Sequence, residues 1–576
     1  MIHAESKHRN GALPLRPPDV VMRLRRMGSF HQTRISFMRS LLRRIANEGW
    51  VLTRPLFELD QEGYGTVVYR VETPAGVCTL VAFSHELQPD ERTDRVIAKK
   101  WDATFALTLG EPTAADIERL HANVPKQEAG RVSANECVLS RANKSVRLFE
   151  HIVNCLAHGW QPSLEDVVDV GYLMRTTAVY GNGKFGLADL PRTFGSGLFT
   201  RPFEAEMLTV YLIREFTIDL VEHIAAARAP LRATRLDPPH ARALGIGNST
   251  GLGMAPFLVA HPTLLHRWMI SRETALARVL NQAEAAPDKR HLFVRLLQRA
   301  IGHVAEWHTQ DARQASRVEQ LHRELVELGE GLPNADAEWL TRVYPWQRLA
   351  DWAAAHGSEE LQELLNSLIL EPYGELVDGL ADAMTDPETP GFDPAMTLGE
   401  LRALIERHYS WALSIDFDQA DAQHFFWYRS EEKEEPRLGE RSKEPGAEWE
   451  MRLGIAREVQ ALYDALTSTT LDANGCVAAF LMHWPDWRYA VRRVQTIDGH
   501  HYGEIRDNLL GADCLAIDLL RCKLSFFGAI KFDPKSDRWT RITMYQGAPR
   551  FVELDGETAD AWALPVFIGK QPELHA

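Results

Sequence analysis

The chain has 576 residues, of which 45% are hydrophobic and 25% are charged, the balance of an ordinary globular protein rather than a disordered one. That length exceeds one core and predicts roughly two to four domains. A formal net charge of −15 repels phosphate backbones, and no apolar run approaches the roughly 20 residues of a membrane span, so we expect neither a nucleic-acid nor a membrane partner.

The six cysteines have neither CxxC spacing nor the cadence of zinc ligands. We interpret them as free thiols in a reducing compartment, which predicts a cytoplasmic protein.

Residues 1–50 are expected to form a tail followed by a basic amphipathic helix. Eight arginines lie among apolar residues there: Arg16, Arg23, Arg25, Arg26, Arg34, Arg39, Arg43 and Arg44. A transit peptide is also rich in arginine, but Glu5 and the pair Pro17–Pro18 come first and no secretory apolar region is present. The pattern therefore favours a helix that docks on a cytosolic surface.

Residues 51–110 change to the period of strands. The runs PLFELD, TVVYRVE and VCTLVAF are rich in β-branched and aromatic residues, and QEGYG and TPAG between them are turn sequences. This pattern predicts a small three-stranded antiparallel meander.

A helical core domain is expected over residues 111–380, followed by a linker rich in Pro, Asp and Thr at 381–398. Apolar residues recur at helical spacing in five candidate helices, over 140–159, 204–228, 263–282, 289–308 and 313–329. No repeat of fixed period is visible, so we do not expect a solenoid.

Residues 399–576 are expected to be an α+β region. The charged stretch 429–446 cannot bury much and predicts an exposed loop or flap, and the runs SFFGAIKF and RWTRITMY around DPKSD predict a hairpin. The predicted fold class is mainly α with α+β portions, in which a large helical core joins an N-terminal meander and a C-terminal β-hairpin.

The segment 243–257 is the first candidate for a ligand site. Its four glycines surround Asn248, Ser249 and Thr250, and one of them, Gly251, follows directly. Glycines let backbone N–H groups approach an anion closely, and hydroxyl groups add donors. The segment lacks the Lys-Ser or Lys-Thr pair of a P-loop and the strand of a dinucleotide fingerprint. A tight connection between helices is the alternative.

The segment 174–186 is the second candidate. Arg175 and Lys184 are suited to clamping a carboxylate or phosphate, Asn182 to binding substrate, and Tyr180 to donating a proton. The alternative is a helix end whose cations favour the helix dipole.

The run SRANKSVR adds Arg147 as a third candidate for anion binding. Its three cations lie near what reads as a helix N-terminus, where cations are unfavourable, so a bound anion or salt-bridge partners are needed to compensate them. Salt bridges are the more ordinary solution.

Metal and nucleophile signatures are weak. Glu118 and His121 have ExxH spacing, and Asp219 and His223 are four residues apart, but no second ExxH accompanies them. The elbow GxSxG and the motifs HExxH and SxxK are absent. We therefore expect no metal, and no cofactor is indicated.

These patterns predict an enzyme that acts on a small anionic metabolite by lyase or hydrolase chemistry, with Arg175, Lys184 and Tyr180 as catalytic residues. A flavin- or nucleotide-dependent oxidoreductase is one alternative. The other is a non-catalytic interaction protein that docks through its N-terminal helix and the stretch 429–446. Assembly into a homo-oligomer is left open.

Overall fold

A computed structural model describes residues 14–88, 100–124, 133–176, 197–248, 262–384, 392–417, 426–430, 433–439, 447–451, 455–468, 472–506, 515–528, 531–534 and 540–564. Nine of the strands in these ranges form one sheet, in the order β1-β2-β3-β4-β5-β6-β7-β12-β11. Their bounds are β1 Val51–Leu59, β2 Gly65–Thr73, β3 Gly76–Ser84, β4 Ala103–Leu109, β5 Glu136–Lys144, β6 Tyr172–Thr176, β7 Gly245–Asn248, β11 Lys531–Pro534 and β12 Thr540–Met544.

This sheet shows that the predicted fold class is wrong. The expected meander is only the first part of a larger sheet, and the pair β11–β12 is its far edge rather than a separate hairpin. Residues 136–144, which read as the approach to a helix, form β5, and the helix α5 starts at Phe149 (Phe149–Ala157). Long-range pairing between strands almost 300 residues apart joins β7 to β12, and local periodicity carries no signal for such pairing.

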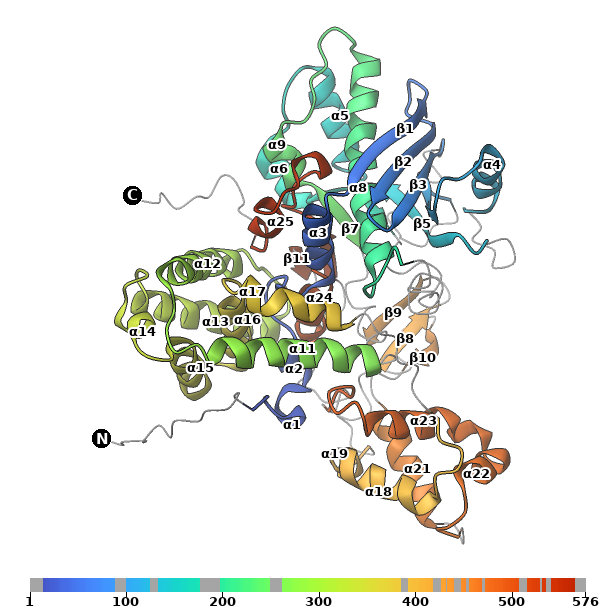
Figure 1. The fold of residues 1–576 in the computed structure, drawn as a ribbon. Coiled ribbons are helices and arrows are strands. Elements are labelled where there is room, and N and C mark those ends of the chain that lie inside the picture. The colour runs from blue at the N-terminus through green and yellow to red at the C-terminus, as the bar shows by residue number, and fades with distance from the viewer. Residues whose placement is uncertain are drawn as a thin grey trace.

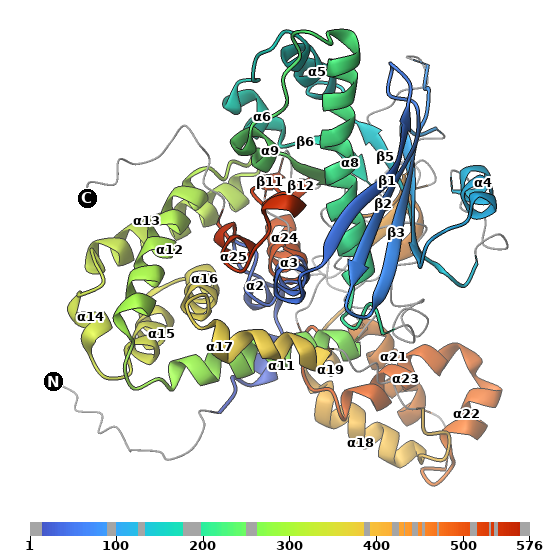
Figure 2. The same cartoon turned by 45° about the horizontal axis from the view of Figure 1, so that its top comes forward.

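One helix organises the sheet. Helix α8 (Glu204–Arg228) is buried along most of its length, and the curved sheet lies beside it in Figure 2. The turn between β1 and β2 reaches this helix, because a Cβ at Gly63 would lie 2.8 Å from Ile224. From the middle of α8, Arg214 donates hydrogen bonds to four backbone carbonyls, those of Ala241, Leu244, Ala548 and Pro549. The helix therefore ties β7 and the C-terminal segment to the core.

The remaining helices form two groups, both visible in Figure 1. The first group packs into the same core as the sheet, and includes α1 Pro18–Val21, α2 Leu24–Met27, α3 Phe37–Glu48, α6 Leu164–Val170, α9 Pro238–Ala243, α11 Pro262–Leu280, α12 Pro287–Ala305, α13 Ala312–Gly331, α14 Glu338–Thr341, α15 Pro345–His356, α16 Glu359–Leu370, α17 Gly374–Val377, η5 Asp378–Met384, α24 Ala516–Phe527, η7 Phe551–Glu553 and α25 Thr558–Ala561. Helix α4 (Ala114–Asn123) covers the opposite face of the sheet through Leu120.

The second group lies within residues 392–506 and has a separate hydrophobic core. Its helices are α18 Leu398–His408, α19 Ser410–Leu413, α21 Ala456–Ser468, α22 Val477–His483, η6 Pro485–Trp487 and α23 Arg488–Ile497. A small antiparallel sheet accompanies them, with β8 Phe426–Ser430, β9 Lys433–Gly439 and β10 Ala447–Met451 in the order β10-β8-β9. Strand β9 lies within the stretch 429–446 that the sequence predicts to be a charged loop, β8 overlaps its start, and β10 follows it.

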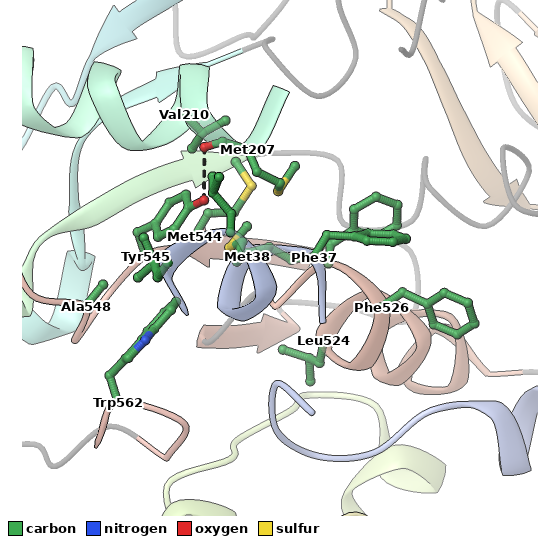
Figure 3. Close-up of a cluster of buried hydrophobic side chains, with 14 of the residues drawn as sticks. Phe37, Met38, Met207, Val210, Leu524, Phe526, Met544, Tyr545, Ala548 and Trp562 are labelled. Carbon is green, nitrogen blue, oxygen red and sulfur yellow. Dashed lines mark hydrogen bonds between the residues drawn. The ribbon is translucent and has the colours of Figure 1, made fainter. Parts of the chain in front are cut away.

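The main core is assembled from segments far apart in the sequence. Figure 3 shows Phe37 and Met38 of α3 beside Met207 of α8 and residues of α24 and β12. Tyr545 follows β12 and donates its hydroxyl to the carbonyl of Met207 at 2.9 Å. The N- and C-terminal parts of the chain thus complete one core.

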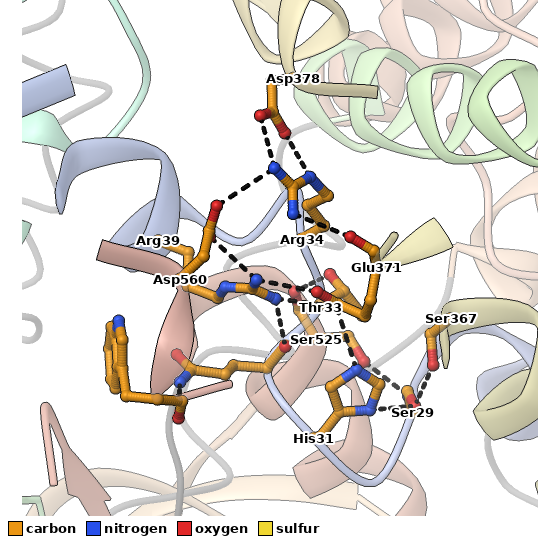
Figure 4. Close-up of polar contacts among 12 residues, drawn as sticks. Ser29, His31, Thr33, Arg34, Arg39, Ser367, Glu371, Asp378, Ser525 and Asp560 are labelled. Carbon is orange, nitrogen blue, oxygen red and sulfur yellow. Dashed lines mark hydrogen bonds and ion pairs between the residues drawn. The ribbon is translucent and has the colours of Figure 1, made fainter. Parts of the chain in front are cut away.

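All the described N-terminal arginines except Arg23 are buried or half-buried. Arg39 binds both carboxylate oxygens of Glu371 at 2.8 Å and also contacts Asp560, as Figure 4 shows. Arg34 pairs with Asp378 in the same cluster. Further ion pairs join Arg16 to Glu273 and Glu363, Arg25 and Arg26 to Glu359, Arg43 to Asp560 and Arg44 to Glu204. The basic segment docks on acidic helices of its own chain.

A serine, a histidine and a glutamate meet within this cluster. Ser29 Oγ lies 3.3 Å from His31 Nδ1, and His31 Nε2 lies 3.3 Å from Glu371 (Figure 4). All three side chains are buried, Ser29 Oγ is also 2.8 Å from Ser367, and Glu371 is held by Arg39. We interpret them as part of the packing rather than as a nucleophilic triad, because a substrate has no access to the hydroxyl group.

None of the helices in the described ranges is both long and apolar enough to cross a membrane.

Candidate functional site

The two glycine-containing segments begin at neighbouring strands. Strands β6 and β7 are the parallel pair among the described strands, and Arg175 of β6 lies opposite Gly247 of β7. Because parallel strands end at the same edge of a sheet, the segments that follow β6 and β7 leave from one edge. Ligands in open α/β sheets bind outside the carboxyl ends of parallel strands.

The predicted site residues are only partly within the described structure. Arg175 is the penultimate residue of β6 and is buried. Asn248 is the last residue of β7, where its backbone pairs with Ile542. The remaining residues of the two segments lie outside the described ranges: Tyr180, Asn182, Lys184, Ser249, Thr250 and Gly251.

Close packing explains the first two glycines of the 243–257 segment. A Cβ at Gly247 would lie 2.7 Å from the ring of Tyr172 and 2.8 Å from Cγ of Arg175. A Cβ at Gly245 would lie 2.3 Å from the carbonyl oxygen of Met544. These glycines therefore form a strand rather than a loop, and they let two side chains of β6 lie flat across β7.

A row of polar residues crosses the sheet beside Gly247. His85 N donates to the carbonyl of Asp102 at 2.9 Å, Asp102 N donates to Asn143 Oδ1 at 3.2 Å, and Asn143 lies opposite Arg175. Residues that lie opposite one another in adjacent strands point to the same face. The row from His85 to Arg175 thus brings a histidine, a carboxylate, an amide and a guanidinium group to one face.

At the start of β4 and the end of β5, the two strands are joined by hydrogen bonds from side chains to backbone groups. The Asp102 carboxylate accepts a hydrogen bond from the backbone N–H of Lys144 at 3.0 Å, while the Asn143 side chain accepts from the backbone of Asp102. Both residues are buried. These reciprocal bonds hold the two side chains in place at the end of the strands.

A second arginine lies close to Arg175. Arg141 is two residues before Asn143 on β5, so it shares the face of Arg175 and is its diagonal neighbour, about 7–8 Å away between Cα atoms. Its guanidinium group lies over the ring of Trp101, 5.3 Å from the ring centroid. Arg141, Asn143 and Arg175 therefore lie on one face of the sheet, with the Arg141 guanidinium group over Trp101 and the Arg175 side chain beside Gly247.

His85 supplies a titratable group on the same face. Its Nε2 lies 2.8 Å from Thr104 Oγ1, and Thr104 lies directly opposite Arg141. Burial and then the neighbouring His121, whose ring centroid is 5.8 Å away, lower the pKa of His85 to about 4. The imidazole is therefore neutral at pH 7, and its lowered pKa makes it a weak base there.

The structure places Arg147 away from this face. Strand β5 runs antiparallel to β6, so the turn 145–148 continues past the start of β6, where Ser145 N bonds to the carbonyl of Leu173. Arg147 is exposed in that turn, while Lys144 lies 4.8 Å from the ring centroid of Phe149. Arg141 and Lys144 are strand residues, so the expected conflict with a helix dipole does not arise.

The other sequence candidates do not form metal sites. His223 bonds to the carbonyl of Asp60 and Asp219 to Tyr69, so the Asp219–His223 pair does not share a ligand position. Within the described part of the chain, no group of three or more His, Cys, Asp or Glu side chains is placed to hold a metal ion.

The sequence offered no signal for His85, Asp102 and Asn143. They lie in three different strands and belong to no motif, and only the register of β3, β4 and β5 brings them beside Arg175. The cations of SRANKSVR were noticed, but Arg141 joins Arg175 through strand pairing rather than through a helix.

No family model, no curated protein and no solved structure matches this chain. Inference about function therefore has to begin from the polar row itself.

Proposed function

We propose that this protein is an enzyme that binds a small carboxylate- or phosphate-bearing metabolite at the parallel pair β6–β7. The observation that carries the proposal is the placement of Arg141 and Arg175 as diagonal neighbours on one sheet face, with Asn143 between them. Guanidinium groups match the planar geometry of carboxylates and phosphates and bind them through paired hydrogen bonds.

The chemistry proposed for this site is proton transfer of the lyase or hydrolase type. Arg141 and Arg175 would hold the anionic group, and His85 would be the proton-transfer group on the same face, as a weak base with a pKa near 4. Tyr180, Lys184 and Asn182 after β6, and Asn248, Ser249, Thr250 and Gly251 at and after β7, remain proposed contributors from the same edge. The sequence predicts Tyr180 or a histidine as the proton-transfer group, and His85 is the histidine proposed for that role.

The alternatives are an oxidoreductase and an interaction protein. An oxidoreductase with a bound flavin or nucleotide would show the absorbance of that cofactor after purification. An interaction protein that docks through its N-terminal basic helix is disfavoured, because Arg16, Arg34, Arg39 and Arg44 form ion pairs inside the chain.

The test measures binding of inorganic phosphate and of succinate by calorimetry. Hydrogen bonds to charged groups contribute about 1.5–3 kcal/mol, so we expect Arg175→Gln and Arg141→Gln each to weaken the affinity for one of these anions by about ten- to a hundredfold. Arg323→Gln, at an exposed position of α13, is the matched control and should change nothing. Thermal melting of each variant verifies that it is folded.

Arg147→Gln distinguishes an anion site on the sheet face from one at the turn between β5 and α5. Unchanged affinity would agree with the sheet-face site, and a loss as large as that of Arg175→Gln would move the anion toward the β5–α5 turn. Equal affinity in wild type, Arg141→Gln and Arg175→Gln would remove the proposal.

A further inference from the structure

Two arginines of α12 lack the carboxylate partners that the other cations of this helix have. Lys289 and Arg290 each pair with an acidic residue of another segment. Among the described residues, no carboxylate oxygen lies within 4.0 Å of a side-chain nitrogen of Arg295 or Arg299. The helix itself supplies no carboxylate either, because the positions three and four residues away from these arginines carry no acidic side chain. The two arginines are four residues apart and therefore lie on the same face of α12.

Arg299 lies half-buried against the end of α25. Its two terminal nitrogens donate to the carbonyl of Ala561, the last residue of α25, at 3.4 and 3.3 Å. Its Nε is buried and has no hydrogen-bond acceptor among the described residues. Because a guanidinium group carries five N–H donors, one distant carbonyl leaves most of them available to a further acceptor.

The ion-pair cluster beside Arg299 is balanced without it. This cluster, part of which Figure 4 shows, contains three arginines and three carboxylates: Arg34, Arg39, Arg43, Glu371, Asp378 and Asp560. Burial lowers the pKa of Arg299, as do Arg295 and Arg39, and Glu371 opposes them. A guanidinium group nevertheless stays protonated in proteins. Arg295 and Arg299 therefore add two positive charges for which the described part of the chain offers no ion-pair partner.

We propose that Arg295 and Arg299 bind the phosphate group of a small molecule, between α12 and the end of α25. The Cβ atoms of residues four apart on a helix are about 5–6 Å apart, so both guanidinium groups can reach one anion. A guanidinium group binds two phosphate oxygens through paired hydrogen bonds. Two positive charges match a phosphate, which carries a charge of about −1.5 to −2 at pH 7, better than they match a single carboxylate.

The different exposure of the two arginines suits this role. Arg295 is exposed and gives an anion access from solvent. Arg299 has lost part of its hydration, so an anion at close range stabilises its charge more strongly than it would in water. Binding here is independent of the site proposed on the sheet, because Arg141 and Arg175 belong to β5 and β6.

Calorimetric titration of the full chain with inorganic phosphate and with glycerol 3-phosphate tests the site. We expect Arg299→Gln to weaken one phosphate-binding event by about ten- to a hundredfold, and the exposed Arg295→Gln to weaken the same event by less. Arg290→Gln is the matched control on the same helix. This arginine already has a carboxylate partner, so its replacement should leave every affinity unchanged.

The two titrants also identify the source of the phosphate group. Tighter binding of glycerol 3-phosphate that is lost in Arg299→Gln would assign the site to a phosphate ester. Equal binding of the two titrants, lost in the same variant, would assign it to inorganic phosphate. Both results support the site.

Melting temperatures distinguish a phosphate site from an arginine that only supports α25. Phosphate should raise the melting temperature of Arg299→Gln by less than that of wild type or Arg290→Gln. Without phosphate, Arg299→Gln should melt at or above the wild-type temperature, because a positive charge near Arg39 is removed. A lower melting temperature that phosphate raises as much as in wild type would leave Arg299 a structural role only and overturn the proposal.

Unchanged phosphate affinity in both Arg295→Gln and Arg299→Gln would also overturn it. If only Arg141→Gln and Arg175→Gln weakened phosphate binding, the site on the sheet would stand and the site on α12 would fall. If only the α12 variants weakened it, the site on α12 would stand alone.

Discussion

Arginines serve two purposes in this molecule, and their neighbours distinguish them. In the N-terminal segment, Arg39 faces Glu371 and Asp560, and Arg16, Arg34 and Arg44 likewise pair with carboxylates of other elements. On the sheet, Arg175 has Asn143 and Gly247 as its cross-strand neighbours, and Arg141 is its diagonal neighbour. The first arrangement joins distant parts of the chain, whereas the second places two arginines on one face of the sheet together with Asp102.

The difference shows why a basic stretch of sequence is a poor guide to a ligand site. The N-terminal segment carries the densest arginine pattern, yet its charges are compensated by glutamates from α11 and α16. The arginines of β5 and β6 are 34 positions apart and form no visible pattern. Three variants test this contrast, and their expected effects decrease in order.

Glu371→Ala should produce the largest loss. It leaves Arg39 and His31 buried without the carboxylate that both contact. Breaking a buried ion pair by removing one partner lowers the free energy of unfolding by about 3–5 kcal/mol. Urea denaturation measures this loss in the free energy of unfolding. Arg342→Ala, which removes an exposed pair with Glu338 on one helix, is the control, with an expected loss of less than about 1 kcal/mol. Similar losses in the two variants would contradict a structural role for the cluster.

His303→Gln should change the response of stability to acid. Burial, with the nearby His31, lowers the pKa of His303 to about 4, so between pH 6.5 and 4 the unfolded chain binds more protons than the folded one. The free energy of unfolding of the wild type should therefore fall as pH drops through this window, by up to about 1.4 kcal/mol per pH unit from this group.

The variant lacks the titratable imidazole of His303. Its free energy of unfolding should therefore fall less steeply over the same pH range, as measured by urea denaturation at several pH values. Below that range both proteins should lose further stability. Burial alone would raise the pKa of Glu371, but Arg39 and His31 outweigh it and lower this pKa to about 2. Identical slopes for wild type and variant between pH 6.5 and 4 would show that His303 does not titrate as expected.

Gly247→Ala should have a smaller effect on stability but a specific effect on the site. The added methyl group would collide with Tyr172 and Arg175, and such overpacking lowers the free energy of unfolding by about 1–3 kcal/mol. Phosphate affinity should fall with it, because Arg175 is displaced.

Gly302→Ala should change the stability in the opposite direction. Gly302 is inside α12 with nothing within 4 Å of the added Cβ, so replacement by alanine should stabilise the protein by roughly 0.5–1 kcal/mol. A Gly247→Ala variant with unaltered melting temperature and phosphate binding would show that β7 does not support Arg175.

Local sequence patterns predicted the long helices but not the inner strands of the sheet. Residues 204–228 have helical periodicity, and α8 occupies that range. The predicted helices near 263–282, 289–308 and 313–329 likewise coincide closely with α11, α12 and α13. By contrast, β4 to β7 were not predicted. Strands β4 and β6 are buried at almost every position and lack the alternation that identifies a strand, whereas β5 alternates in burial but overlaps the helix predicted over 140–159.

The sequence by itself determined the long amphipathic helices and the first three strands with their turns, because each depends on neighbours within a few residues. Only the tertiary structure decided that these strands belong to one sheet, that the N-terminal arginines face inward, and that Arg175 lies in a row with His85, Asp102 and Asn143. Those relations depend on the register between strands and on charges from distant helices. Such contacts form between residues far apart in the chain, and no local period encodes them.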